Sequence, residues 1–200
     1  GWGIGGSATD NYEMGLDTTV HHGGRPSAFI KSKVPVSSGF ATITQGFRAD
    51  DYRGKRLRLS GHVKTKDADQ GAWLWISLNC QTEYVLDNMH IMHDRRIKGT
   101  SDWKTCDIVL DVPKDAVNID FGVALTGAGH AWFDDLQFDI VGPDVPVSTS
   151  SDASITKSDT GDLPYVARNP RAKPVNLDFE SKRSPAPPQP PQGRQIAKGW

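Results

Sequence analysis

Residues 106–141 read CDIVLDVPKDAVNIDFGVALTGAGHAWFDDLQFDIV, and this stretch decides the fold class of the chain. Three runs in which polar and apolar residues alternate stand at 106–112, 117–127 and 130–141. A period of two residues is typical of strands with one buried face, and the Pro, Asp and Gly residues between the runs are typical of tight turns. The β-branched residues of the second run favour a strand over a helix. The stretch therefore predicts three consecutive antiparallel strands.

The same pattern extends toward the N-terminus. The earlier runs that predict strands are Ser27–Val34, Phe40–Phe47, Arg56–Thr65 and Trp73–Asn79. Gly61 interrupts the third run and predicts a bend or bulge there. The opening residues GWGIGGS predict a turn or loop. About eight short strands without a helical period predict an all-β protein, an antiparallel β-sandwich of the jelly-roll type.

Composition excludes several classes of partner. The chain has 200 residues, with 23 basic and 24 acidic side chains and a formal net charge of -1. Near neutrality gives no general attraction to nucleic acid or to anionic membranes. No apolar run reaches the roughly 18–20 residues that a membrane helix needs. We therefore expect no nucleic-acid partner and no membrane partner.

The distribution of proline divides the chain. Residues 1–141 predict the jelly-roll sandwich, and residues 142–174, rich in Ser, Thr, Asp and Pro, predict an extended linker. Residues 182–200 form a Pro-rich tail. Between them, VNLDFES (175–181) is strand-like, and an isolated strand is unstable in water. We expect it to dock on the sheet, either in cis or in a neighbouring copy.

Several segments together resemble a known family. GKRLRLSGHVK (54–64), Trp103, the PKDA turn (113–116) and WFDDLQF (132–138) follow one another in the order seen in galactose-binding-like jelly rolls. The chain resembles in particular the carbohydrate-binding modules of the xylan- and β-glucan-binding type. The resemblance implies a non-catalytic module that binds a saccharide or another small polar ligand. Such modules occur in secreted hydrolases and in bacterial helix-turn-helix regulators, so both an extracellular and a cytoplasmic location stay open.

One departure from the family pattern concerns the opening strand. Members usually begin with an N-x-x-F-E strand that precedes Gly-Trp, whereas this chain begins at Gly1-Trp2 and carries NLDFE at 176–180. Either the chain is one period of a tandem array, or the late segment folds back and supplies the missing strand. In the first case the module links copies by strand exchange. A structural, assembly or sensor module of a larger bacterial protein is therefore the alternative function, with a strand-exchanged homo-oligomer as its partner.

Two tryptophans are the strongest candidate for a binding surface. On a strand, Trp73 and Trp75 point to one face, and Leu74, Ile76 and Leu78 point to the other. The indoles either line an open concave surface, where the C–H faces of sugar rings stack on them, or are buried as packing residues.

The polar segment that follows extends this candidate site. Tyr84 and Trp103 would add aromatic surface, while Asp87, Asn88 and Arg95 can make the paired hydrogen bonds that vicinal hydroxyls or a carboxylate require. The alternative is a structural hairpin in which Asp87 and Asn88 satisfy turns and Arg95 pairs with Asp102. The candidate ligand-binding residues are Trp73, Trp75, Tyr84, Asp87, Asn88, Arg95 and Trp103.

The acidic pair in WFDDLQF is the candidate metal site. By alternation, Trp132, Asp134, Leu136 and Phe138 share one side of the strand, and a carboxylate among core residues needs a partner or a cation. In the family that the chain resembles, such a pair helps to hold a structural Ca²⁺. That resemblance implies Asp134, Asp135 and Glu180 as ligands, together with backbone carbonyls around residues 23–27. The alternative is that the aspartates hydrogen-bond to the backbone or pair with Arg25 or Lys31.

Other motifs carry little chemistry. His90 and His93 have a spacing that suits a metal, but the sequence shows no third ligand. Cys80 and Cys106 cannot form a disulfide framework, and they leave the compartment undetermined. The sequence contains no Gly-x-Ser-x-Gly, His-Glu-x-x-His or Walker motif, so we expect no enzyme.

Overall fold

The computed structural model describes residues 1–24, 26–35, 39–81, 84–85, 95–148 and 170–179. These residues are almost entirely in strands, apart from one short 3₁₀ turn (Thr9–Asn11). They include no helix with the length and apolar character needed to cross a membrane. The strands are β1 (Gly3–Gly5), β2 (Tyr12–Asp17), β3 (Ser27–Ser32), β4 (Phe40–Arg48), β5 (Arg56–Cys80), β6 (Tyr84–Val85), β7 (Ile97–Asp111), β8 (Ala116–Thr126) and β9 (His130–Val141).

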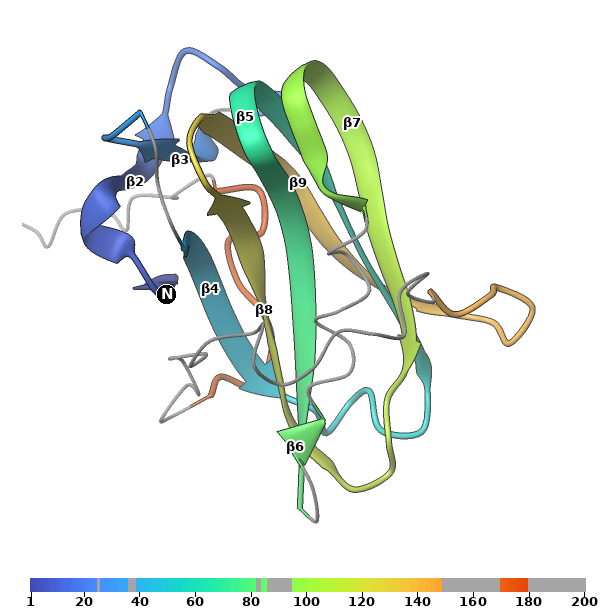
Figure 1. Ribbon diagram of the computed structural model, residues 1–200. Helices are drawn as coiled ribbons and strands as arrows, with labels where there is room; N and C mark the ends of the chain where they lie inside the picture. Colours follow the sequence, from blue (N-terminus) through green and yellow to red (C-terminus); the bar gives the residue numbers. More distant parts are fainter. Residues whose placement is uncertain (25, 36–38, 82–83, 86–94, 149–169, 180–200) are drawn as a thin grey trace, which may run out of the picture.

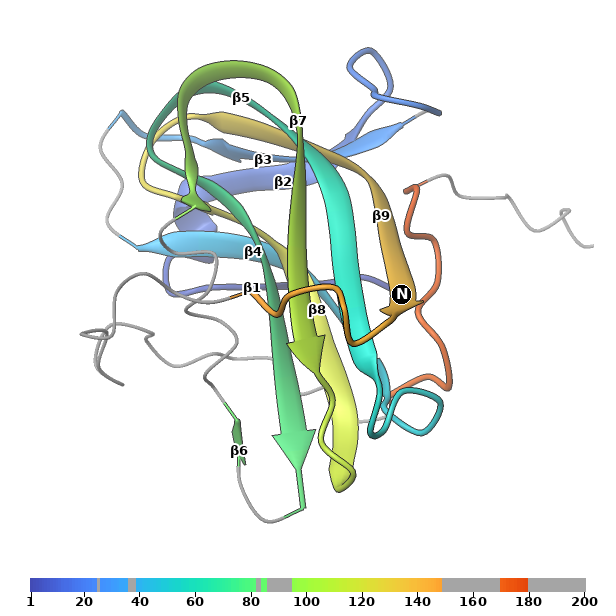
Figure 2. The ribbon, with the colours of Figure 1, turned by 90° about the vertical axis from the view of Figure 1, so that its right-hand side faces the viewer.

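One antiparallel sheet with the order β1-β4-β8-β5-β9-β3-β2 curls on itself, and β6 and β7 also pair with β5. The centre of the sheet is β5, which pairs with β9 over Arg56–Lys66 and with β8 over Gly71–Cys80. Together with β7, it arches from one layer into the other (Figures 1 and 2). The result is the predicted all-β antiparallel sandwich.

The core lies between the two layers. From the layer of β9 and β3 come residues such as Ile30, Leu59 and Phe133, all 0% exposed. Ile76 and Phe121 face them from the layer of β8 and β4, and they are also 0% exposed. Apolar side chains removed from water in this way supply the main driving force for the fold.

The largest difference from the sequence prediction concerns β5. The expected strands Arg56–Thr65 and Trp73–Asn79 are one continuous strand of 25 residues. The polar residues between them lack a period of two, which suggested a loop. In the structure Asp67 and Gly71 take positive φ angles there, and the pairing with β7 shifts register, so the strand bends without ending.

Two further elements were not predicted. Gly3–Gly5 was expected to be a turn or loop, yet it is strand β1, paired with β4. Strand β2 pairs with β3 at the opposite end of the sheet. Both are edge strands. Their glycines and charged residues interrupt the alternation of polar and apolar residues from which strands are predicted.

Residues 170–179 pack against the sandwich of the same chain, in cis (Figure 2). The side-chain amide of Gln45 donates to the Val175 carbonyl and accepts from the Val175 backbone N–H. The backbone N–H of Leu136 donates to the Leu177 carbonyl at 3.0 Å. Phe179 is 1% exposed, and its ring stacks on Trp2 with the centroids 5.0 Å apart. The segment is not the expected strand, because Asn176 and Phe179 have positive φ angles and the chain turns there.

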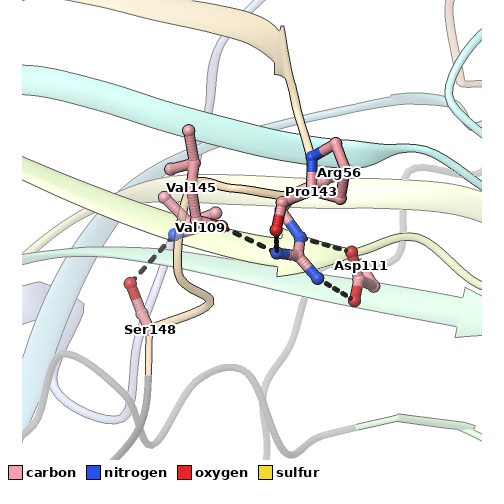
Figure 3. A network of polar contacts seen from close by, with 6 residues as sticks. All are labelled: Arg56, Val109, Asp111, Pro143, Val145 and Ser148. Atoms are coloured by element: carbon pink, nitrogen blue, oxygen red, sulfur yellow. Dashed lines mark hydrogen bonds and ion pairs between the residues drawn. The ribbon is translucent and has the colours of Figure 1, made fainter.

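The first residues of the expected linker also contact the sandwich. The Arg56 guanidinium forms a bidentate ion pair with Asp111 and donates to the carbonyls of Pro143 and Val145 (Figure 3). The backbone amide of Ser148 donates to the Val109 carbonyl at 2.8 Å. Residues 142–148 therefore lie along β7, and the ordered contacts continue past residue 141.

Candidate functional site

The layer formed by β4, β8 and β5 has two faces of different chemistry. One face carries the aliphatic core residues Leu74, Ile76 and Leu78. Register places the following residues on the other face, which we name the indole face: Thr42, Thr44, Trp73, Trp75, Ser77, Asn79, Asp120, Gly122 and Ala124. This face combines aromatic, hydroxyl, amide and carboxylate groups on three adjacent strands.

The two indoles lie side by side on this face and are held by the sheet. Trp75 donates from Nε1 to the Thr42 hydroxyl at 2.8 Å, and Trp73 donates to the Thr126 hydroxyl at 3.3 Å. A Cβ added to Gly122 would lie 2.8 Å from Trp75 Nε1, so only glycine lets this ring approach the sheet. Each tryptophan is 5% exposed, which agrees with the packing alternative and leaves the predicted contact with a ligand untested.

Polar groups continue the indole face along β5. The Asn79 amide donates to Asp120 Oδ2 at 2.5 Å. The Ser77 hydroxyl and the Asn79 carbonyl oxygen are buried and have no hydrogen-bond partner among the described residues. A buried polar atom without a partner costs free energy, so these two atoms are sites where a ligand hydroxyl would be favoured.

Of the polar segment that follows β5, only some of the residues lie near the indole face. The Arg96 guanidinium lies over the Trp73 ring, 5.2 Å from its centroid, whereas the neighbouring Arg95 is exposed. Tyr84 belongs to β6, where its backbone pairs with Asn79. Asp87 and Asn88 lie outside the described residues.

Trp103 lies in a different environment from the indole face. Its ring meets the edge of His22 at 5.6 Å, beside the first half of β5. Its described ring contacts include neither Trp73 nor Trp75. Asp102 pairs with Lys64 at 2.6 Å and not with Arg95, so the predicted alternative pairing is wrong.

The acidic pair of β9 sits on a bulge. Asp135 has a φ of 49°, and this bulge shifts the alternation of side chains along β9 by one residue. Phe133 before the bulge and Leu136 after it therefore both face the core. The prediction that Asp134 and Leu136 lie on one side by simple alternation is wrong for this reason. Asp134 is 0% exposed, and its carboxylate accepts the backbone amides of His22 and Asp135. Burial raises the pKa of the Asp134 carboxyl despite these hydrogen bonds.

This arrangement bears on the expected calcium ion. The Asp134 oxygens already accept amides, and Asp135 Oδ2 lies 2.8 Å from His22 Nδ1. Calcium takes six to eight oxygen ligands, so these two carboxylates alone would not complete its coordination, and the ion stays a prediction. Glu180, the third expected ligand, lies outside the described residues.

Sequence reasoning missed several residues of these sites. Thr42, Ser77 and Asp120 were not singled out, although the alternation of the predicted strands places them on the same face as the tryptophans. His22 and His62 were missed because their approach depends on how two distant segments pack. The cysteines are both free thiols, and burial raises the pKa of Cys106 to about 11.

A curated protein is similar in sequence to this chain over most of the chain's length. No family model matches the chain. A relative described as the uncharacterized HTH-type transcriptional regulator YbfP of Bacillus subtilis (strain 168) is 40% identical over 185 residues. The alignment covers 91% of this chain and 57% of that protein, so the chain spans little more than half of the relative's length.

Solved structures share the fold at low sequence identity. The enzymatically active domain of tailspike protein 4 from bacteriophage CBA120 aligns over 70% of this chain and 19% of its own, with a TM-score of 0.54 and 15% identity. The C-terminal family 22 carbohydrate-binding module of Clostridium thermocellum Xyn10B aligns over 70% of this chain and 87% of its own, with a TM-score of 0.48 and 13% identity. The strand pairing of the structure confirms the predicted antiparallel β-sandwich.

Proposed function

We propose that this chain is a non-catalytic ligand-binding module that holds a saccharide on the indole face. The observation that carries the proposal is the pairing of two adjacent indoles with buried, unpartnered polar atoms of Ser77 and Asn79 on one sheet face. Indoles stack on the C–H faces of sugar rings, and hydroxyl and amide groups bind sugar hydroxyls.

The small residues of the face support the same function. Gly122 and Ala124 of β8 lie between the tryptophans of β5 and the threonines of β4. Because their side chains are small or absent, they leave space beside the indole rings. The Arg96 guanidinium over Trp73 occupies the position that a stacked sugar would take, and it can move to hydrogen-bond the ligand instead. We expect affinities of roughly micromolar to millimolar, because the indoles are 5% exposed and uncovering them for a ligand costs part of the binding free energy.

The relative in Bacillus subtilis suggests the kind of larger protein in which this module works. Its name describes a helix-turn-helix transcriptional regulator, and this chain aligns with about half of it. We infer that the module serves as the ligand-sensing part of such a regulator. The assembly alternative has less support, because residues 170–179 pack against the sandwich of their own chain.

The test is a calorimetric titration of the full chain with xylo-, gluco-, manno- and galacto-oligosaccharides. We expect saturable binding of one sugar class, and at least a tenfold weaker Kd for Trp73→Ala and Ser77→Val. Trp103→Ala is the matched control and should bind as the wild type, because its ring lies beside His22. A folded protein that binds no member of the panel, or variants that bind it equally well, would contradict the proposal.

A further inference from the structure

Two histidines and one aspartate from three separate parts of the chain meet on the other layer. His22 follows β2, His62 lies on β5 and Asp135 lies on β9. The two imidazole rings stack with centroids 3.6 Å apart and planes inclined by 14°. One nitrogen or oxygen atom from each of the three residues falls within 4.8 Å of the others.

The backbone around the cluster holds these groups in place. The buried carboxylate of Asp134 accepts the His22 amide at 2.8 Å and so anchors the loop that carries this histidine. A Cβ at Gly23 would lie 2.7 Å from Asp135 Oδ2, so the loop passes close to this carboxylate and a larger residue would displace it. The bulge at Asp135 turns its side chain toward His22.

One atom of the cluster lacks a hydrogen-bond partner. The Nδ1 atom of His62 is buried and has no partner among the described residues. A neutral imidazole nitrogen with an unshared electron pair is the form that binds metal ions.

The cluster is also open to solvent on one side. His62 and Asp135 line a hollow of about 750 Å³, whose other walls come from Tyr52, from β5 and β9, and from side chains of the segment 170–179. A bound ion could therefore exchange with solution and keep a water molecule as a further ligand.

We propose that His22, His62 and Asp135 bind a divalent transition-metal cation of the zinc class, with water completing the coordination. Two imidazoles and a carboxylate suit zinc, nickel or copper, whereas calcium takes oxygen ligands almost exclusively. Bonds of about 2.0–2.1 Å in a tetrahedral site place ligand atoms about 3.3 Å apart. To place both imidazole nitrogens on one ion, the 2.8 Å contact between His22 Nδ1 and Asp135 Oδ2 opens and the two stacked rings, inclined by only 14°, tilt toward each other.

The first experiment is a calorimetric titration of the full chain with Zn²⁺, and with Ca²⁺ in parallel. We expect one Zn²⁺ per chain and at least tenfold weaker binding in each of His22→Gln, His62→Gln and Asp135→Asn. His21→Gln and the double variant His90→Gln/His93→Gln are the controls for other histidines and should bind as the wild type. Circular dichroism of every variant without metal confirms that it is folded.

A second measurement locates the ion without changing its ligands. Since the Trp103 ring lies 5.6 Å from that of His22, Cu²⁺ in the cluster should quench the fluorescence of this indole. The quenched fraction should therefore fall in Trp103→Phe. The proposal is overturned if Zn²⁺ does not bind, if only the His90/His93 variant loses binding, or if Trp103→Phe leaves the quenched fraction unchanged.

Discussion

At the scale of single residues, His130 shows how packing controls a charge. Its ring stacks on Trp132 with centroids 3.6 Å apart and meets the edge of Phe29 at 5.5 Å. Burial, with help from Lys31, lowers the pKa of His130 to about 4, although Asp17 and Glu13 oppose this shift and Lys66 adds to it. The folded protein therefore resists a proton that the unfolded chain accepts.

This difference predicts an acid-sensitive stability. Because the folded pKa lies below the unfolded one, the contribution is complete above pH 6.5 and is lost as the pH falls toward 4. We expect the loss at this site to amount to about 2 kcal/mol after allowance for solvent screening. Urea unfolding of the wild type and His130→Phe at pH 7 and pH 4.5 measures it, with His21→Gln as the control. Equal pH dependence in the wild type and His130→Phe would refute this account.

Gly122 makes a second prediction at this scale. A Cβ there would lie 2.4 Å from the Ile43 carbonyl and 2.8 Å from Trp75 Nε1, both in the packed sheet. Gly122→Ala should therefore destabilise the fold by about 2–3 kcal/mol, as overpacking does. Gly99→Asn is the matched control, because nothing lies within 4 Å of Gly99 and asparagine tolerates its positive φ. Equilibrium unfolding of both variants would decide, and equal stabilities would contradict the prediction.

At the scale of elements, residues 170–179 contribute to the core without forming a strand. Phe179 is 1% exposed against Trp2, and the backbone of Val175 is held by Gln45. Phe179→Ala should lower the free energy of unfolding by about 3–4 kcal/mol, since a large buried side chain is removed. Arg171→Ala should change it little, because that exposed residue binds β4 through its carbonyl. A neutral effect of Phe179→Ala in urea would show that the segment does not pack there in solution.

The elements also show what the sequence can and cannot predict. Strands such as Ser27–Ser32 and His130–Val141 were recognised, because one face is apolar and the alternation is clear. The bend of β5 and the bulge at Asp135 were missed or misread, because positive φ angles at non-glycine residues leave no mark in the sequence. The indole pair was identified from its spacing alone. The His22–His62 contact was not, because it depends on the docking of a loop onto a distant strand.

At the scale of the whole molecule, the two layers are one cooperative unit. Strand β5 supplies central pairings to both layers, so its release from one layer disturbs the pairings of the other. We expect a single unfolding transition, with coincident curves from far-UV circular dichroism and tryptophan fluorescence. Two separated transitions would show instead that the layers unfold independently.

The shared strand also governs the order in which the protein can be made. Arg56, at the start of β5, pairs with Val141 at the end of β9. This pairing of the central strand cannot form until β9, far along the chain, is available. Pairings of such long sequence separation are slow to form. A ribosome must therefore release the whole of β9 before the sandwich can close, and until then the apolar face of β5 stays exposed to chaperones and to other nascent chains.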